Sequence, residues 1–195
     1  DVLGAELVSN GDFETGEIGS TNLIQYSEDF SQITRNNSTI ITNNSVSPDG
    51  TTNANLWLAK NTASGKELEE RWGVTNGVTY TESWFVKYNS FQFIQMVTTS
   101  STFGSKYTNF DILNGIKGDS NHTDCSIKEV GNGWFRISAT QVAVSDGVGR
   151  LGALRMVSSA TSPRGESVTT NGTEAVEVFG HQAEALPYAT SYIPN

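Results

Sequence analysis

One segment, residues 130–138, constrains the fold of this chain more than any other. It contains the turn Gly131-Asn132-Gly133, and large apolar and polar residues then alternate up to residue 138. Glycine and asparagine tolerate the positive φ that a tight turn needs, and a period of two is the period of a β-strand. The segment therefore predicts a β-turn followed by a strand. We expect Trp134, directly after the turn, to be a buried core residue.

Other segments with β-strand character recur along the chain at a spacing of roughly 8–12 residues, which is typical of a β-sandwich or β-barrel. The predicted strands are 38–42, 54–59, 68–75, 79–88, 91–99, 106–111, 126–130, 134–144, 150–157 and 174–183. Turn signals such as Pro48-Asp49-Gly50 and Asn171-Gly172 separate them. No alternation of strands with helices is visible, so a parallel α/β fold is not expected.

The length of 195 residues and the hydrophobic content of 36% fit one domain with a large polar surface. No run of ten residues has the pattern of an amphipathic helix. We therefore predict an all-β protein, a two-sheet antiparallel β-sandwich of the jelly-roll type. Residues 1–20 are predicted to form an N-terminal strand or arm, and residues 21–195 the sandwich.

The charge of the chain limits its partners. The formal net charge is −9 at pH 7, and no basic patch is visible in the sequence. We therefore expect neither nucleic acid nor an anionic membrane surface as a partner. The single cysteine, Cys125, excludes an internal disulfide and a metal site built from cysteines. No apolar stretch of 18 residues occurs, so no transmembrane helix is expected.

Several short motifs follow one another in a fixed order. They are Asn22-Leu23-Ile24 with Tyr26-Ser27-Glu28, Ser47-Pro48-Asp49-Gly50, Tyr80-Thr81 with Phe85-Val86-Lys87, Phe110-Asp111-Ile112, the segment 130–136, and Gly180, Gln182 and Glu184 before Tyr188-Ala189-Thr190-Ser191-Tyr192. In this order they resemble the carbohydrate-binding-module-like β-sandwich of bacteriophage tail and fibre proteins. The N-terminal Asn10-Gly11-Asp12-Phe13-Glu14 is also similar to the start of family 4/9-type carbohydrate-binding modules.

The resemblance covers about residues 22–195, and it is specific for the module rather than for a ligand. It implies a jelly-roll sandwich without catalytic activity, glycan binding on one sheet face or at the loop rim, and an extracellular or virion-associated location. The sequence departs from the usual pattern at Glu82, where an apolar residue is usual. It departs also at His181 and Ala183, where a small residue and a leucine are usual. These departures concern local packing.

A sugar site needs flat apolar faces for the C–H side of a pyranose ring and planar polar groups for its hydroxyls. Alternation places Tyr80, Trp84 and Val86 in the core, with Ser83, Phe85 and Lys87 on an open face. The predicted contacts around one groove are Arg71, Phe85, Lys87, Gln92, Tyr107 and Arg155, with Trp57 as a stacking platform. The net charge favours a neutral glycan, although Arg71 and Arg155 could hold a uronate or a sulfate.

The resemblance also implies a structural calcium ion, which prefers carboxylate and carbonyl oxygens. By their positions in the motifs, the candidate ligands are Asp12, Glu14, Glu28 and Glu184, together with Asp49. Asp49 already has a role as a turn residue in Pro-Asp-Gly.

Catalysis has weak support in the sequence. A glycosidase needs two carboxylates at a fixed separation. Glu67 and Glu69 would share one face of a strand, but the Glu-x-Asp-x-x-Glu pattern of sandwich-fold glucanases is absent. His122 and His181 have no partner that the sequence identifies. A hydrolase or lyase is therefore disfavoured.

Two other hypotheses remain open at this point. The first is a non-catalytic module that binds a polysaccharide, either a neutral plant or algal glycan or a glycan of a bacterial surface, within a phage or secreted protein. The second is a structural module of a viral fibre, which would form a stable homo-oligomer and bind no sugar.

Overall fold

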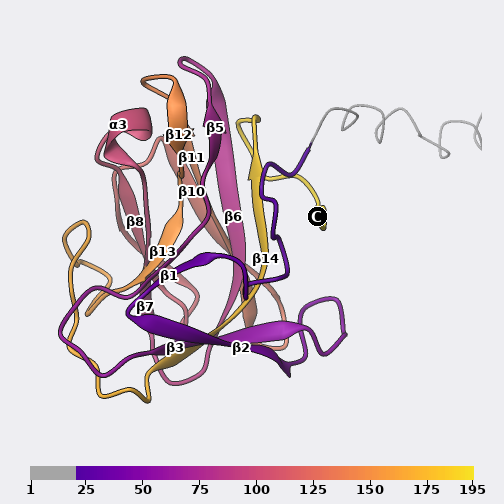
Figure 1. The fold of residues 1–195 in the computed structure, drawn as a ribbon, viewed down its shortest axis with the longest axis vertical. Coiled ribbons are helices and arrows are strands. Elements are labelled where there is room, and N and C mark those ends of the chain that lie inside the picture. Colours follow the sequence, from indigo (N-terminus) through magenta and orange to yellow (C-terminus); the bar gives the residue numbers. More distant parts are fainter. Residues whose placement is uncertain (1–20) are drawn as a thin grey trace, which may run out of the picture.

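The structure, a computed structural model, describes residues 21–195, and the predicted arm at residues 1–20 lies outside this range. Two six-stranded antiparallel sheets pack face to face (Figure 1), so the predicted antiparallel sandwich is confirmed. Each sheet takes strands from both halves of the chain, as a jelly roll does. No helix among the described residues is long and apolar enough to cross a membrane.

Two sheets and one small ribbon contain the strands. Sheet A has, in spatial order, β1 (Thr34–Asn36), β4 (Glu67–Glu69), β13 (Ala153–Met156), β7 (Phe93–Val97), β8 (Tyr107–Asp111) and β9 (Ile116–Ser120). Sheet B has β10 (Asp124–Gly131), β11 (Trp134–Val142), β6 (Thr79–Tyr88), β14 (Ala175–Glu184), β3 (Ala54–Ala59) and β2 (Ser38–Ser45). The ribbon pairs β12 (Gly147–Gly149) with β5 (Trp72–Val74), beside the one-turn helix α3 (Ser100–Phe103).

The β10–β11 hairpin confirms the turn predicted from the sequence. Gly131, Asn132 and Gly133 have φ values of 98°, 53° and 78°, so all three residues lie in the left-handed region. Residues with larger side chains would be strained there, which explains the Gly-Asn-Gly sequence. The turn sets the register in which Ile127 pairs with Ile137.

The predicted strand 68–75 divides into two. β4 joins sheet A and β5 joins the small ribbon with β12, with Glu70 and Arg71 between them. The sequence alternation does not show this break, because it continues unchanged through it. Trp72 and Val74 are buried on the same side as Leu68.

The main core lies between the two sheets. Its largest members include Trp57, Trp84, Phe30, Phe103 and Phe110. Tyr80, Trp84 and Val86 of β6 all belong to it, as alternation predicts. A second, smaller cluster lies on the outer face of sheet B and contains Ala54, Phe85, Trp134 and Phe179. Trp134 is therefore buried as expected, but outside the interior of the sandwich.

Two departures from the family pattern, Glu82 and His181, meet inside the sandwich. His181 Nε2 lies 2.7 Å from Glu82 Oε1, and both side chains are fully buried. The His181 ring stacks on Trp84, with the ring centroids 3.5 Å apart. The other Glu82 oxygen accepts hydrogen bonds from the backbone N–H groups of Leu151 and Gly152, at 2.9 and 2.7 Å. The two unusual residues thus pair with each other and tie β6 to the segment before β13, while His181 Nδ1 is buried without a hydrogen-bond partner.

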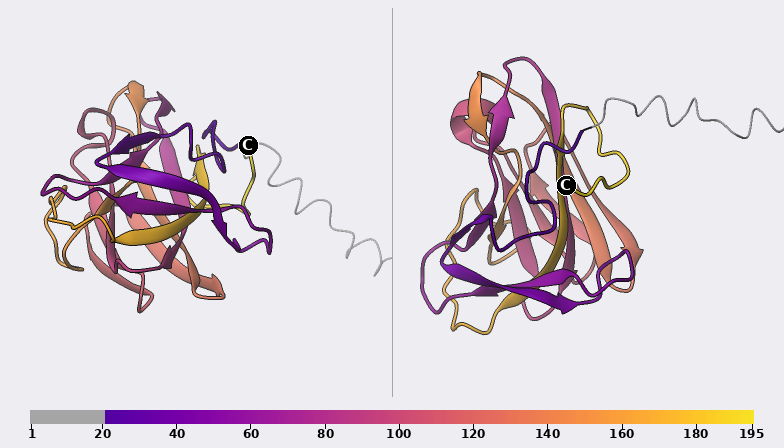
Figure 2. Two further views of the ribbon diagram at one scale, coloured as in Figure 1. Left: turned by 60° about the horizontal axis from the view of Figure 1, so that its bottom comes forward. Right: turned by 45° about the vertical axis from the view of Figure 1, so that its right-hand side comes forward.

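The first described residues lie beside the C-terminus (Figure 2). The Asn22 side chain donates to the carbonyls of His181 and Ile193, at 3.1 and 2.9 Å. Its oxygen accepts from the backbone N–H groups of Ile24 and Ala183. The first and the last motifs of the sequence are therefore joined in space.

Candidate functional site

The C-terminal segment covers the part of the outer face of sheet B that is formed by β6, β11 and β14. The Tyr192 ring packs edge-on against Phe85, with the ring centroids 5.6 Å apart, and also contacts Phe179. Arg136 donates to the carbonyl of Thr190 at 2.5 Å and to Ser83 Oγ at 2.9 Å. Burial raises the pKa of the Tyr192 hydroxyl above its ordinary value. A ligand cannot reach Phe85 or Phe179 without displacing the C-terminal segment.

The outer face of sheet A instead carries charged groups, which we call the arginine network (Glu67, Glu69, Arg71, Arg150 and Arg155). Arg150 forms ion pairs with both glutamates. Arg155 Nη1 lies 2.9 Å from Glu67, and Arg71 Nη2 lies 3.3 Å from Glu69. The two glutamates share one strand face, as predicted, but the arginines bury them. Held between guanidinium groups, they are engaged as ion-pair partners.

Part of the same face lies under the loop 158–167. Gln95 and Asn109 are fully buried there. Gln95 accepts from the backbone N–H of Gly165 at 2.7 Å, and Asn109 donates to the carbonyl of Ser162 at 2.8 Å. Arg164 holds the tip of the loop down by donating to the carbonyl of Thr98 at 2.6 Å.

A hollow of about 330 Å³ opens where this loop leaves β13 and the turn after β6 meets β7. We call it the aromatic hollow. It is lined by Tyr88, Ser90, Phe91, Gln92, Phe93, Val157, Ser158, Val168 and Thr169. Tyr88 is exposed, and Phe91 and Phe93 are half-buried. Three aromatic rings with an amide and several hydroxyl groups between them provide both apolar faces and hydrogen-bonding groups.

The orientation of Gln92 in the aromatic hollow is set by Asp111. Gln92 Nε2 donates to Asp111 Oδ2 at 3.0 Å. Burial alone would raise the pKa of Asp111, but hydrogen bonds from Asn114, Gln92 and Leu113 hold it below its ordinary value. The ionised carboxylate can only accept, so the amide nitrogen of Gln92 faces it and the amide oxygen is left to accept from a ligand.

A buried lysine supports one wall of the hollow. Lys66 is fully buried, and its ammonium group donates to the carbonyls of Thr62 and Val168, at 2.5 and 2.6 Å. Burial lowers the pKa of Lys66. These two bonds fasten the strand-like segment that carries Val168 and Thr169, so this wall is pre-formed.

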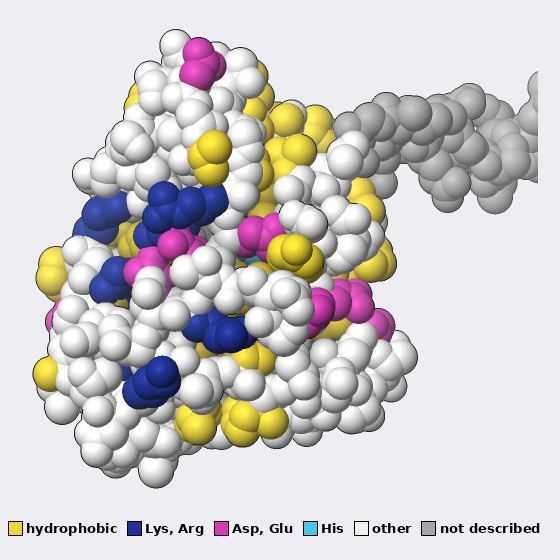
Figure 3. Space-filling view, viewed as in Figure 1, with side chains coloured by type: hydrophobic (Ala, Val, Ile, Leu, Met, Phe, Trp, Pro, Cys, Tyr) yellow, Lys and Arg dark blue, Asp and Glu magenta, His cyan; other side chains and the backbone are white. Residues whose placement is uncertain are grey.

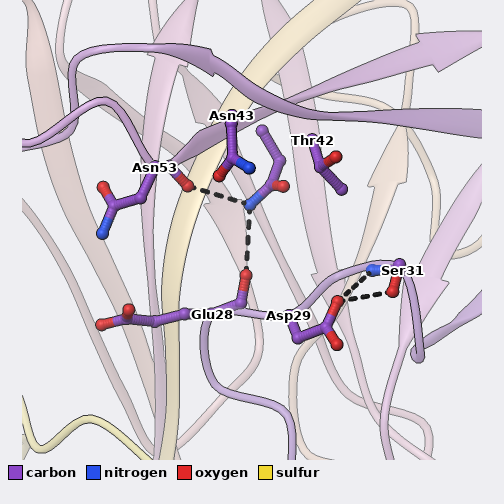
Figure 4. Close-up of a pocket in the computed structure, with 7 residues that line it drawn as sticks. Glu28, Asp29, Ser31, Thr42, Asn43 and Asn53 are labelled. Carbon is purple, nitrogen blue, oxygen red and sulfur yellow. Dashed lines mark hydrogen bonds between the residues drawn. The ribbon is translucent and has the colours of Figure 1, made fainter.

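A second hollow, of about 360 Å³, is lined by polar residues alone, and we call it the amide hollow: Glu28, Asp29, Ser31, Thr42, Asn43, Asn53 and Asn55. In Figure 4, Asn43 and Asn53 face Glu28 and Asp29 across it. Asn55 bridges the two sides by donating to the carbonyls of Glu28 and Asn53, at 3.4 and 3.5 Å. It offers hydrogen-bonding groups, but no aromatic side chain lines it on which a sugar ring could stack.

The structure corrects the groove expected from the sequence, because it separates the predicted contacts. Trp57 is fully buried in the main core, so it is not a stacking platform. Phe85 is buried under Tyr192, and Lys87 pairs with Glu177 on sheet B at 3.7 Å. The prediction fails at Phe85 because the C-terminal segment covers a face that alternation alone leaves open, and at Trp57 because its side chain belongs to the main core.

The remaining predicted residues lie on or near sheet A. Arg71 and Arg155 belong to the arginine network, Gln92 lines the aromatic hollow, and Tyr107 is half-buried on β8, where it pairs with Val97. Glu69 is buried by Arg150 on the same face.

Sequence reasoning missed Tyr88, Phe91, Phe93 and Arg150. The aromatic residues flank a turn, Asn89-Ser90, between two strands, and turns often carry binding residues. That signal could have identified them.

The predicted calcium ligands do not come together in the described part of the chain. Asp12 and Glu14 lie outside the described residues. Both Glu184 oxygens accept hydrogen bonds from Thr190, at 3.1 and 2.5 Å. The hydrogen bond from Ser47, with others from Thr51 and Asn53, lowers the pKa of Asp49 to about 2 within its own turn. Within residues 21–195, no group of three or more His, Cys, Asp or Glu residues could hold a metal ion.

Three solved structures are similar to this chain. A family 61 carbohydrate-binding module in complex with β-1,4-galactotriose is 9% identical, with a TM-score of 0.48 over 84% of this chain and 98% of that one. The enzymatically active domain of bacteriophage CBA120 tailspike protein 4 is 11% identical, with a TM-score of 0.48 over 83% and 21%. The CBM22-1–GH10 modules of Clostridium thermocellum xylanase 10B, complexed with xylohexaose, are 14% identical, with a TM-score of 0.44 over 91% and 30%.

The chain thus spans 21% and 30% of the length of the second and third of these proteins. The likeness to these structures concerns the fold alone. No family model and no curated protein matches the sequence.

Proposed function

We propose that this protein is a non-catalytic carbohydrate-binding module and that the aromatic hollow holds a sugar ring of a polysaccharide. The observation that carries the proposal is the grouping of Tyr88, Phe91 and Phe93 around one hollow that also contains an oriented amide, Gln92. The C–H face of a pyranose packs on aromatic rings, while its hydroxyls need acceptors and donors at the rim. The setting proposed for such a module is a phage or secreted protein that meets glycans outside the cell.

The carboxylates nearest the aromatic hollow fit binding better than catalysis. Asp111 accepts hydrogen bonds from Gln92, Leu113 and Asn114, which favour its ionised form. Glu166 accepts from the backbone N–H of Ser158, and this bond, with others, lowers its pKa. A general acid needs a raised pKa so that it carries a proton at neutral pH. Both groups are shifted in the opposite direction.

Affinity gel electrophoresis against a panel of neutral polysaccharides (xylan, mannan, galactan and glucans) and acidic ones (a polyuronate and a sulfated galactan) tests the proposal. We expect at least one polysaccharide to retard the protein, and Phe91→Ala and Tyr88→Ala to weaken binding about tenfold through loss of ring contact. The matched control is Tyr188→Ala, which removes an aromatic side chain that is 55% exposed on the C-terminal segment. Equal retardation of all three variants, or no retardation by any polysaccharide, would refute the aromatic hollow as the site.

A fibre module is the second candidate, and one surface feature favours it. Val144 and Val148 are 56% and 65% exposed, and both lie beside α3 at one end of the sandwich. Exposed apolar side chains that gather at one place are typical of contact surfaces. Light scattering after size exclusion separates the candidates: a stable oligomer that Val148→Lys dissociates supports the fibre module, and a monomer at high concentration contradicts it.

A further inference from the structure

The arginine network contains more hydrogen-bond donors than acceptors. Three guanidinium groups, each with five N–H donors, share the carboxylates of Glu67 and Glu69. Arg155 finds one more acceptor, the carbonyl of Glu166, at 3.5 Å. The Nε–H groups of Arg150 and Arg155 are buried and have no hydrogen-bond partner, whereas the buried oxygens Glu67 Oε1 and Glu69 Oε2 are already engaged in the ion pairs with Arg150. A buried donor without an acceptor is costly, so the network is short of oxygen atoms.

The same region also has an excess of positive charge. Arg164 lies close enough to Arg150 to lower its pKa by repulsion, as does Arg155, in addition to the larger effect of burial. Arg164 and Lys106 act in the same way on His122. Against the five cationic side chains of this region (Lys106, Arg71, Arg150, Arg155 and Arg164), the observed ion pairs supply two carboxylates. This concentration is notable in a chain whose net charge is −9.

The chain makes room for this network at Gly65. A Cβ atom at Gly65 would lie 2.1 Å from Arg155 Nη2, so any larger residue would displace the guanidinium group. The glycine therefore lets Arg155 lie flat against the backbone, with its charge held in place beside Glu67.

The network is accessible from solvent on one side. Arg71 is 46% exposed at its side chain. Figure 3 shows Lys and Arg side chains gathered around Asp and Glu side chains on one face of the molecule. The network also adjoins the aromatic hollow, because Arg155 pairs with Gln95 in the ladder and Val157 N–H donates to the carbonyl of Phe93 at 3.1 Å. A glycan seated in the hollow can extend along sheet A toward the arginines.

We infer that the arginine network binds the oxyanion group, a carboxylate or a sulfate, of an acidic sugar, so that the module takes an anionic glycan. The inference rests on the proposed function, since it names the class of glycan. An oxyanion supplies the missing acceptors and offsets the excess positive charge, and guanidinium groups bind such planar or tetrahedral oxyanions through paired N–H donors. The overall negative charge is no barrier at close range, because salt screens it within about 10 Å at 0.1 M ionic strength.

The test is a titration observed at the arginine Nε–H signals in a two-dimensional ¹H–¹⁵N spectrum. The probes are methyl β-D-glucuronide, glucose 6-sulfate and, as the neutral counterpart, methyl β-D-glucoside. We expect one or both acidic sugars to shift the signals of Arg71, Arg150 and Arg155 in a saturable manner. The glucoside should leave these signals in place, and those of Arg35 and Arg136 should not move. Comparing the titrations with the glucuronide and the sulfated sugar distinguishes a carboxylate from a sulfate as the bound oxyanion.

Variants assign the effect to the network. Arg71→Gln and Arg155→Gln should each weaken binding of the acidic sugar about fivefold, since each removes one guanidinium group with its paired N–H donors. Lys128→Gln removes the same charge from an exposed position on β10 of sheet B and should leave the affinity unchanged. Thermal unfolding checks that Arg155→Gln folds, and Arg71→Gln, at an exposed side chain, tests the inference if it does not.

Three results would overturn the inference: no saturable shift with either acidic sugar, equal shifts with the glucoside, or tighter binding of a single-stranded oligonucleotide than of both acidic sugars. Its failure is distinct from failure of the proposed function. Loss of neutral-glycan binding in Phe91→Ala concerns the aromatic hollow, whereas the arginine signals report the network directly.

Discussion

Both sheets have strands that alternate in sequence, but different groups cover their outer faces in the folded protein. On sheet B, Phe85, Trp134 and Phe179 are sealed by Tyr192 into a second apolar cluster. On sheet A, Glu67 and Glu69 are sealed by arginines into a charged network that is short of acceptors. An apolar cluster is complete once it is covered, whereas a network of ions is complete only when every donor has an acceptor. The outer face of sheet B therefore contributes stability, and we propose that binding belongs to the outer face of sheet A and the adjoining aromatic hollow.

Trp134→Ala should have the largest effect and should act on stability alone. The change removes a side chain that is 1% exposed and leaves the carbonyl of Val46 without its donor, Trp134 Nε1, at 3.1 Å. The free energy of unfolding should fall by about 4 kcal/mol, the usual cost of truncating a buried aromatic residue. Urea denaturation measures it, and Trp134→Phe should lose less than half as much. Weakened glycan binding by folded Trp134→Ala would contradict the division between the sheets.

The second largest effect should be a loss of stability at low pH, caused by a buried histidine beside sheet A. His122 lies against β8, with Nδ1 2.7 Å from Thr108 Oγ1. Burial, together with the charges of Lys106 and Arg164, lowers the pKa of His122 to about 4. The unfolded chain, with a His pKa of about 6.5, then binds a proton that the folded chain resists. Stability should therefore fall by up to about 3 kcal/mol as the pH falls from 6.5 to 4.

Denaturation midpoints at a series of pH values measure this loss. In His122→Asn the titrating group is absent, so this part of the pH dependence should vanish. A wild-type protein whose stability is flat between pH 6.5 and 4 would be inconsistent with a buried neutral His122.

Glu67→Gln should destabilise the protein by about 2 kcal/mol. Breaking a buried ion pair usually costs more, but here Arg150 keeps Glu69 as a partner. Glu129→Gln, at an exposed position on β10, is the control for the loss of one negative charge. Denaturant titration of both variants gives the difference. If Glu67→Gln were as stable as the control, the network would not be tightly held.

Arg71→Gln should change stability least, by less than about 0.5 kcal/mol, because its side chain is nearly half exposed and its ion pair is partly screened by water. The same variant should nevertheless weaken binding of an acidic sugar. If Arg71 belongs to a binding surface, its replacement should leave the free energy of unfolding nearly unchanged and still weaken the affinity for the sugar. A large loss of stability would instead place Arg71 among the structural residues of sheet A.

The sequence predicted the fold well but the site poorly. Strands 54–59 and 79–88 were correct to the residue, because their alternation is regular and polar or turn-forming residues flank them at both ends. The division of 68–75 was missed, since period two continues through the break at Arg71. The single groove was wrong because Phe85 and Arg155 lie on different sheets. Alternation assigns a side chain to one of two faces, but it does not say which segment will cover that face.

The motif at residues 130–138 shows what the sequence determined by itself. Three consecutive residues with positive φ require Gly-Asn-Gly, and period two requires a strand, so the hairpin follows from local sterics alone. Tertiary structure decided the rest. Whether Trp134, Arg150 and the ring of Phe91 face a core, an ion pair or an open hollow depends on contacts between residues far apart in the chain. Such contacts form only when the two sheets pack together and when the loop 158–167 and the C-terminal segment pack against their outer faces.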